Sequence, residues 1–370
     1  MSRDRKPKDR DFIRTPEGMF FCVTGYLHPP DRYTAYLKYS PAPRGRWRKG
    51  TTAYRREIEY YHAQNVGQTI RYLEETYPQY VHDCPVRGIR FSMVPQEHVA
   101  RYYVPQERLQ AILDHPQDRL EREAADLARE IATCAGISLH ALGVTGSILI
   151  ELHNPDLSDI NLLVYGAENA RAVQAALQAA RSPRLHQLQQ DLIERWVGEM
   201  VQWFPLTIEE ARYNVSRRWN YGLFGTRFFG IHPTRSDAEI HERYGDHVYR
   251  SAGGARIQAV VSGTEEALFQ PAVYEIAEVQ VLEGDLTAVH ADQIVCYEGR
   301  YRAVAAVGQR IEAYGKLEHA LTLRAHLRRT PKVLADVCQG VQVAQVDGAP
   351  RRLVIGTTQL KGAEYLKPLI

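Results

Sequence analysis

The sequence lacks the marks of several large protein classes. Its five cysteines form no CxxC pair and its histidines form no cluster, which argues against a zinc site and a disulfide framework. No run of about 18 apolar residues occurs, and the charged start MSRDRKPKDR has no apolar core of the kind that a signal peptide needs. A Walker A motif and a GxGxxG loop are also missing. We therefore expect a soluble, cytoplasmic protein without membrane contact.

The chain also has little excess charge of either sign. Its 46 Lys and Arg residues are balanced by 44 Asp and Glu residues, which leaves a net charge of +2. No field of the whole protein therefore attracts nucleic acid, and any basic contact surface must be local. Apolar residues make up 44% of the 370 residues. A chain of this length exceeds the roughly 250 to 300 residues at which a single core stops growing, so we expect two or three domains.

The most informative stretch, from Gly143 to Gly166, reads GVTGSILIELHNPDLSDINLLVYG. Its pattern predicts a turn at Gly146 and Ser147, a short helix, a second turn, and a strand over residues 160–165. Gly146 allows the backbone to approach a ligand closely, and the free N–H groups of a helix that begins at Ser147 suit a phosphate. The stretch therefore predicts a site for the phosphates of a nucleotide.

The strand in this stretch opens with Asp159 and Asn161. We expect both side chains on one face of the sheet, because side chains two residues apart on a strand point the same way. Two oxygen ligands side by side suit a hard cation such as Mg²⁺ or Mn²⁺, which takes one or two carboxylates together with the phosphates of a substrate. The pattern therefore predicts a site for a nucleoside triphosphate with its metal ion.

Gly146-Ser147, eleven residues, and then Asp159-Ile160-Asn161 resemble the signature of the polymerase-β-type nucleotidyltransferase superfamily. More narrowly, the chain is similar to the archaeal predicted nucleotidyltransferases, also in the stretches DRDFIRTPEGMFFCVTGYLHPPDRYTAYLKYSP, ALFQPAVYEI and IVCYEGRY. The resemblance implies transfer of a nucleotidyl group from a Mg-bound nucleoside triphosphate to a hydroxyl on RNA, another polynucleotide or a protein. It implies that Gly146 and Ser147 hold the phosphates and that Asp159 ligates the metal.

The chain departs from that family pattern at two points. The pattern has a second acid where this sequence has Asn161, whose amide oxygen can coordinate Mg²⁺ but adds no negative charge. The superfamily also has a third carboxylate on a later strand, usually as the base for the attacking hydroxyl, and the later apolar runs 228–232 and 257–261 carry no acid. The alternatives are an inactivated nucleotidyltransferase fold that binds nucleotide or RNA, and a structural subunit in which the motif has no remaining role.

A first basic stretch, RGRWRKGTTAYRR at residues 44–56, holds six basic residues and no acid. Cations that neutralise phosphates, next to aromatic rings that stack on bases, are typical of single-stranded nucleic-acid contacts. An exposed loop has the same composition, so both interpretations stay open. The predicted RNA contacts are Arg44, Arg46, Trp47, Arg48 and Lys49.

A second basic stretch, RYNVSRRWNYGLFGTR, covers residues 212–227. Arg217 and Arg218 lie there beside Trp219, and a guanidinium can clamp a phosphate with two hydrogen bonds or stack on a base. The alternative is a basic turn before the next strand. We predict that these two arginines contribute to nucleotide binding.

The pattern of elements predicts a mixed α+β or α/β fold. Residues 117–134 have the apolar spacing of an amphipathic helix, and short strand-like runs with polar turns dominate after residue 255. We predict a disordered basic arm (1–10), an N-terminal α+β region (11–115), a nucleotidyltransferase-like mixed sheet with helices (116–254), and a small all-β barrel or sandwich (255–370).

Overall fold

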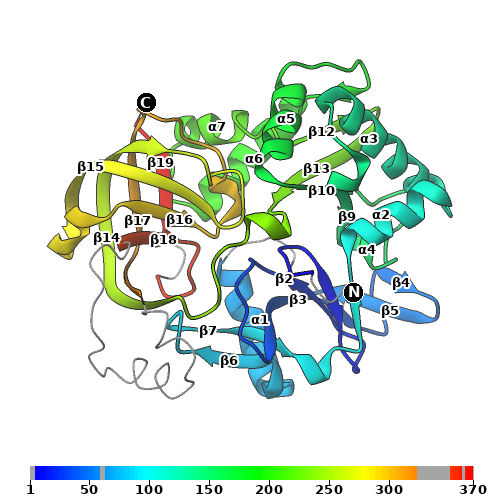
Figure 1. The fold of residues 1–370 in the computed structure, drawn as a ribbon, viewed down its shortest axis with the longest axis horizontal. Coiled ribbons are helices and arrows are strands. Elements are labelled where there is room, and N and C mark those ends of the chain that lie inside the picture. The colour runs from blue at the N-terminus through cyan, green and yellow to red at the C-terminus, as the bar shows by residue number, and fades with distance from the viewer. Residues whose placement is uncertain (1–4, 59–62, 323–350, 361–362, 370) are drawn as a thin grey trace.

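The computed structural model describes residues 5–58, 63–322, 351–360 and 363–369. Their strands form three sheets (Figure 1). These are an N-terminal antiparallel half-barrel, a central mixed sheet with helices, and the sheet of a C-terminal part that is mostly β. The predicted mixed class is thus confirmed in outline. Within these ranges no helix combines the length and the apolar character that crossing a bilayer requires.

The N-terminal sheet has the strand order β4-β5-β3-β2-β1-β8, with β7 on β3 and β6 on β7. Strands β2 and β3 pair antiparallel with Cys22 opposite Tyr36, and all four residues of β2 are apolar and buried. One helix accompanies these strands. The elements are β1 (Phe12–Arg14), β2 (Phe20–Val23), β3 (Arg32–Pro41), β4 (Trp47–Lys49), β5 (Thr52–Arg56), α1 (Ala63–Thr76), β6 (Val81–Cys84), β7 (Ile89–Pro95) and β8 (Arg101–Tyr103).

The central sheet has the strand order β11-β12-β13-β10-β9, in which only β10 and β13 run parallel. Helix α3 begins at Asp118, whose side chain caps the helix, and ends at Gly136 with a left-handed φ of 66°. This confirms the helix predicted at 117–134. The elements are α2 (Pro105–Asp114), α3 (Arg119–Ala135), β9 (Leu142–Thr145), α4 (Gly146–Leu149), β10 (Ile160–Tyr165), α5 (Ala167–Gln178), β11 (Leu185–His186), α6 (Gln190–Trp203), α7 (Ile208–Ser216), β12 (Tyr221–Phe224) and β13 (Arg227–Thr234).

The C-terminal strands pair in a closed ring, since β14 contacts both β15 and β17 and the path β15-β16-β18-β17 joins them. Strand β19 adds to β17. Helices α6 and α7 complete the core of this ring through side chains such as Met200 and Ala211. The elements are β14 (His247–Gly263), β15 (Ala272–Gly284), β16 (Gln293–Cys296), β17 (Arg310–Thr322), β18 (Arg351–Ile355) and β19 (Tyr365–Pro368).

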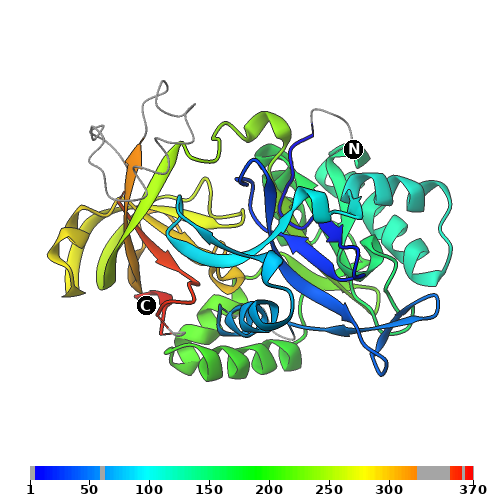
Figure 2. The same cartoon turned by 90° about the horizontal axis from the view of Figure 1, so that it is seen from below.

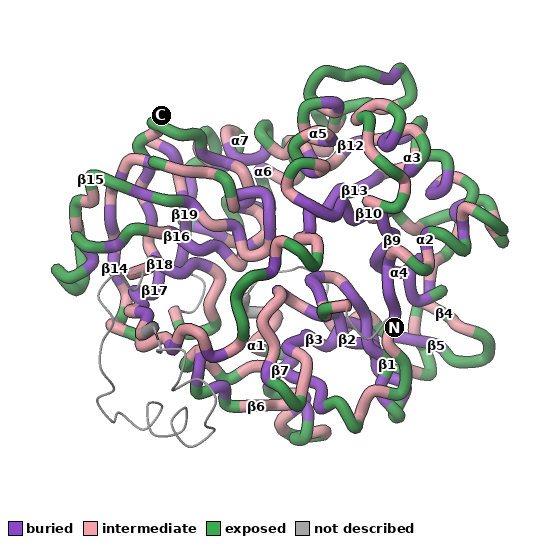
Figure 3. The backbone as a smooth tube through the Cα atoms, in the orientation of Figure 1, coloured by how far each residue is buried: buried purple, intermediate pink, exposed green. Residues whose placement is uncertain are grey.

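The C-terminal ring lies at one end of the long axis of the molecule, and α2 and α3 lie at the other end in both views (Figures 1 and 2). The buried backbone follows the strands of all three sheets (Figure 3). The motif segment links two of the cores, because Leu149 and Leu152, which follow the turn at Gly146, pack against Phe12 and Phe20 of the N-terminal sheet.

Two predicted domain boundaries differ from the packing. Helix α2 lies within the predicted N-terminal region, yet Leu109 and Ile112 pack in the core of the central sheet. Strand β14 runs across the boundary predicted at residue 255. The reason is an irregularity between Ser251 and Gly254, which a strand accommodates as a bulge but which resembles a turn in the sequence.

The disordered arm predicted for residues 1–10 is wrong for residues 5–10. Arg5 donates two hydrogen bonds of 2.7 Å to the carboxylate of Asp11, and the Lys8 ammonium lies 2.6 Å from Asp237 Oδ1. Lys8 is only 1% exposed. This charged segment is ordered because its cations are paired with Asp11 and with the distant Asp237, and the composition of the segment does not show these pairings. Residues 1–4 lie outside the described residues.

Candidate functional site

The motif folds as the predicted turn, short helix, turn and strand. Strands β9 and β10 pair antiparallel with Thr145 opposite Asn161, which places Gly146 next to Asn161. Gly146 has a φ of +70°, a left-handed conformation that glycine adopts without strain. A Cβ added there would lie 3.5 Å from the amide nitrogen of Asn161. Helix α4 has only four residues, all of them buried, and Ser147 is 9% exposed. Phosphate binding at this turn stays a prediction.

Asp159, Asn161 and His232 form a hydrogen-bonded row. The Asn161 amide nitrogen donates to Asp159 at 2.9 Å, and the Asn161 carbonyl oxygen lies 2.8 Å from His232 Nε2. Asp159 is exposed, whereas His232 is 3% exposed. Both ends of the amide are therefore engaged. Coordination of a cation beside Asp159 would require the amide to turn its oxygen outward and give up both contacts.

His232 lies beside Asn161 on a strand later in the chain. Strand β13 runs parallel to β10 with Gly230 opposite Asn161, and neither β13 nor β9, both described in full, carries an acidic residue. A side chain at Gly230 would collide with this arrangement, because its Cβ would lie 3.0 Å from the Asn161 oxygen and 3.2 Å from His232 Nε2. The sequence alone does not point to His232, because the family pattern places an acid, and not a histidine, on a later strand.

The charge around the row is positive. Burial lowers the pKa of His232 well below its usual range, and Arg10, Arg302, Lys38 and Arg218 lower it further. The row itself supplies one carboxylate, one amide and a neutral imidazole. Two divalent cations bring four positive charges, so this set of residues does not fit the pair of Mg²⁺ ions that nucleotidyl transfer uses.

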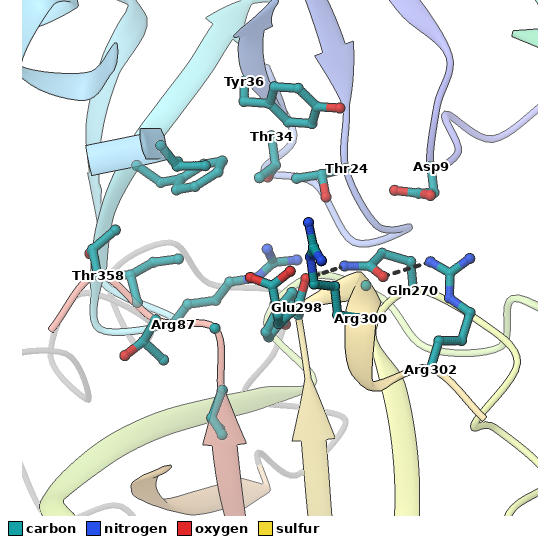
Figure 4. A pocket seen from close by; sticks show the side chains of 18 of the residues that line it. Asp9, Thr24, Thr34, Tyr36, Arg87, Gln270, Glu298, Arg300, Arg302 and Thr358 are labelled. Atoms are coloured by element: carbon teal, nitrogen blue, oxygen red, sulfur yellow. Dashed lines mark hydrogen bonds between the residues drawn. The ribbon is translucent and has the colours of Figure 1, made fainter. Parts of the chain in front are cut away.

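A cavity of about 380 Å³ lies where the three sheets meet. Thr34 and Tyr36 of β3 face Glu298 and Arg302 of the C-terminal part across it (Figure 4). Tyr221 lines the cavity and lies next to the row, with its ring centroid 6.1 Å from that of His232. Arginines outnumber the three lining acids. They are Arg10, Arg87, Arg90, Arg218, Arg300, Arg302 and Arg352.

Comparison with known proteins gives one full-length relative. The chain is 28% identical over 368 residues to an uncharacterized protein of Methanocaldococcus jannaschii, which covers 98% of this chain and 99% of that protein. This similarity carries no function. No protein-family model and no solved structure matches the chain. The archaeal resemblance is thus shown as similarity to an uncharacterized archaeal protein.

The two arginines predicted in the second basic stretch, Arg217 and Arg218, lie in different surroundings. Arg217 is exposed and its guanidinium stacks 3.9 Å from the ring centroid of Tyr213. Arg218 lines the cavity, with its guanidinium 4.7 Å from the ring centroid of Tyr221 and 5.2 Å from that of Trp196. Of the pair, only Arg218 is positioned to meet a ligand in the cavity.

The first basic stretch forms the hairpin β4–β5 and lies outside the cavity lining. Lys49 is tied to the motif segment, since its ammonium lies 2.7 Å from Glu151 and 2.9 Å from the carbonyl oxygen of Ile150. Trp47 packs edge-on against Tyr39. The remaining members, Arg44, Arg46 and Arg48, are exposed. RNA contact through this hairpin stays a prediction.

Asp118, Glu121 and His153 come close enough together to suggest a metal site. The contacts of these side chains are those of the capped N-terminus of α3. Asp118 accepts from the Glu121 amide at 2.9 Å and lies 2.7 Å from His153 Nε2. Glu121 also forms an ion pair with Arg108, a cation that would repel a metal ion. The cluster fits a capped helix better than a metal centre.

This interpretation predicts the behaviour of an Asp118→Ala variant. Loss of the cap of α3 should lower the free energy of unfolding by about 1 kcal/mol, measured by urea denaturation. Addition of Zn²⁺ should leave the melting temperature of the native protein unchanged. A rise in melting temperature with Zn²⁺ that disappears in the variant would identify a metal site instead.

Proposed function

We propose that the protein binds a nucleotide through its phosphates on a nucleotidyltransferase-like sheet that no longer transfers the nucleotidyl group. The observation that carries this proposal is the hydrogen-bonded row of Asp159, Asn161 and His232. It supports loss of transfer, because metal ions normally neutralise the transferring phosphoryl group and align the attacking and leaving oxygens. The single carboxylate of the row does not supply the negative charge that a pair of such ions needs.

Nucleotide binding is supported by what surrounds the row. The Gly146 turn lies beside Asn161, as the resemblance implies for a phosphate site. Arg10, Arg218 and Arg302 supply positive charge close to His232. Guanidinium groups that stay charged can neutralise a phosphate by themselves. We therefore expect binding that does not require a divalent cation.

The test compares transfer with binding in the same preparations. Native protein, Asn161→Asp and the exposed control Asp156→Asn are incubated with each α-labelled nucleoside triphosphate, Mg²⁺ or Mn²⁺, and total RNA. We expect no incorporated label from the native protein or the control. Calorimetric titration with ATP should give the same dissociation constant with Mg²⁺ and with EDTA.

Three other outcomes of this test would distinguish an active nucleotidyltransferase, the proposed binding protein and a structural subunit. Incorporation by the native protein that Asp159→Ala abolishes would show that the amide suffices and that the protein is a nucleotidyltransferase. Incorporation by Asn161→Asp alone would support the proposal, since one added charge would restore the reaction. Absence of both incorporation and ATP binding would overturn the proposal and favour a structural subunit.

A further inference from the structure

The arginines of the cavity differ in how their charge is balanced. Most of them are engaged elsewhere, as Arg300 is with Glu199 at 2.9 Å and Arg352 with Glu318 at 2.8 Å. In the described part of the chain, neither Arg218 nor Arg302 has a carboxylate within 4 Å, and Arg10 forms one long ion pair, with its Nε 3.7 Å from Asp9 Oδ2. Arg10, Arg218 and Arg302, called here the arginine cluster, are therefore short of negative charge.

The arginine cluster lies at one place although its members come from three parts of the chain. All three lower the pKa of His232, and Arg10 also lowers that of Arg302. Arg302 is 9% exposed and donates to the Gln270 side-chain oxygen at 2.7 Å, but among the described residues its Nε has no hydrogen-bond partner, and neither has the Nε of Arg10. An arginine does not lose its proton in a protein. Like charges gathered at one cavity with unused donors are stabilised by an anion.

The backbone fixes Arg10 at this place. Its φ is +67°, an uncommon conformation for a residue with a side chain, and such strain concentrates at ligand sites. The Arg10 amide donates to the Val23 carbonyl at 2.9 Å, and its own carbonyl accepts from the Thr145 hydroxyl at 2.8 Å. Thr145 precedes the motif glycine. The arginine cluster is thus tied directly to the motif.

Aromatic rings lie beside the arginine cluster. Trp196 and Tyr221 flank Arg218. Tyr36 also lines the cavity, on the side that faces Glu298 and Arg302 (Figure 4). A guanidinium fork fits a phosphate with two hydrogen bonds, and an aromatic ring stacks on any base. The volume of about 380 Å³ is at the small end of the range for ligand sites, enough for one nucleotide but not for a chain of them.

We propose that the arginine cluster binds the phosphate monoester of a single nucleotide, without a metal ion, while the base lies among the aromatic residues of the cavity. The nucleotide can be free or can be the 5′-phosphorylated end of a nucleic acid. This inference rests on the proposed function for the class of ligand and adds where the phosphate lies. It differs from the motif interpretation, which places the phosphates at Gly146 and Ser147.

The experiment measures dissociation constants in EDTA for AMP, adenosine, inorganic phosphate and a 5′-phosphorylated oligonucleotide. The proteins are the native chain, Arg218→Gln, Arg302→Gln, Arg218→Lys, and Arg195→Gln as a control at an exposed position of α6. Circular dichroism and melting temperature establish that each variant is folded. Arg218→Lys keeps the charge and removes the fork, so it separates charge from hydrogen-bond geometry.

We expect AMP to bind the native protein more tightly than adenosine does. Arg218→Gln and Arg302→Gln should weaken AMP binding at least about tenfold, the effect of losing a charge-assisted hydrogen bond. Arg218→Lys should lie between native and Arg218→Gln, and Arg195→Gln should match the native protein. Tighter binding of the oligonucleotide than of AMP would identify a nucleic-acid end as the source, and the reverse a free nucleotide.

Two outcomes would overturn the inference and can be told apart. If AMP binds the native protein and both glutamine variants equally, the phosphate lies elsewhere and the proposed function still stands. If no nucleotide binds the native protein at all, both the inference and the proposed function fail. Equal affinities for adenosine and AMP would also contradict a phosphate site.

Discussion

Replacement of Asp11 by alanine is expected to lower the free energy of unfolding by about 3 to 5 kcal/mol, the usual effect of breaking a buried ion pair from one side. Asp11 is fully buried and accepts two hydrogen bonds of 2.7 Å from Arg5, one of 2.6 Å from the Tyr102 hydroxyl and one of 3.0 Å from the Lys8 amide. Without Asp11, the Arg5 guanidinium stays buried with no counter-charge.

The same substitution should weaken AMP binding, because Asp11 holds the segment on which Arg10 lies. Urea denaturation measures the stability change, and calorimetry in EDTA measures the binding. Asp31→Ala is the matched control, since Asp31 pairs with Arg32 at the surface with its side chain 61% exposed. Such a pair contributes less than about 1 kcal/mol. Equal losses of stability in both variants would show that the segment is not held by the Arg5–Asp11 pair.

The sequence predicts those site residues that belong to a pattern within one short stretch of the chain. Gly146, Asp159 and Asn161 stand out because a turn glycine, a fixed spacing and an alternating strand lie within one stretch. The structure places Gly146 at the start of α4 beside Asn161 of β10, and Asp159 directly before β10. Helix α3 is predictable for the same reason, since its apolar period and its cap lie in consecutive residues.

The site residues that the sequence did not predict depend on contacts between residues far apart in the chain. His232 becomes a member of the row only through the parallel pairing of β10 with β13, which no local pattern shows. Arg10 lies in a segment whose composition predicts disorder, yet Asp237 and Asp11 hold that segment in place. Arg302 follows a strand of the C-terminal ring and carries no signal of its own.

These contacts change the chemistry that the motif alone implies. A carboxylate-rich site attracts metal ions, which in turn neutralise the phosphates of a nucleotide. Here an amide and an imidazole stand beside Asp159, and guanidinium groups supply the positive charge directly. Under the proposed function, the same sheet would hold a phosphate without the ions that make the phosphate react.

Glu298 is expected to make stability depend on pH through the physiological range. Burial raises the pKa of this cavity-lining carboxyl group to about 8, even though Arg300 and Arg218 act to lower it, while its unfolded value is 4.5. Between these values the folded state keeps a proton that the unfolded state releases. The free energy of unfolding therefore falls as pH rises from 4.5 to about 8, by roughly 1.4 kcal/mol per pH unit at most, and levels off above.

A Glu298→Gln variant should remove this slope, because its neutral amide does not titrate. The stability of the variant minus that of the native protein is expected to rise through this pH window by up to about 5 kcal/mol, measured by urea denaturation at each pH. Glu298→Asp keeps a carboxyl group in the same wall of the cavity and should keep the slope of stability against pH.

AMP binding to the native protein should also weaken above pH 8, where Glu298 becomes an anion inside the cavity, and Glu298→Gln should not show that loss. Parallel stability curves for the native protein and Glu298→Gln would mean that Glu298 is ionised in the folded state throughout this range, in which case it offsets part of the positive charge that the arginine cluster offers to a phosphate.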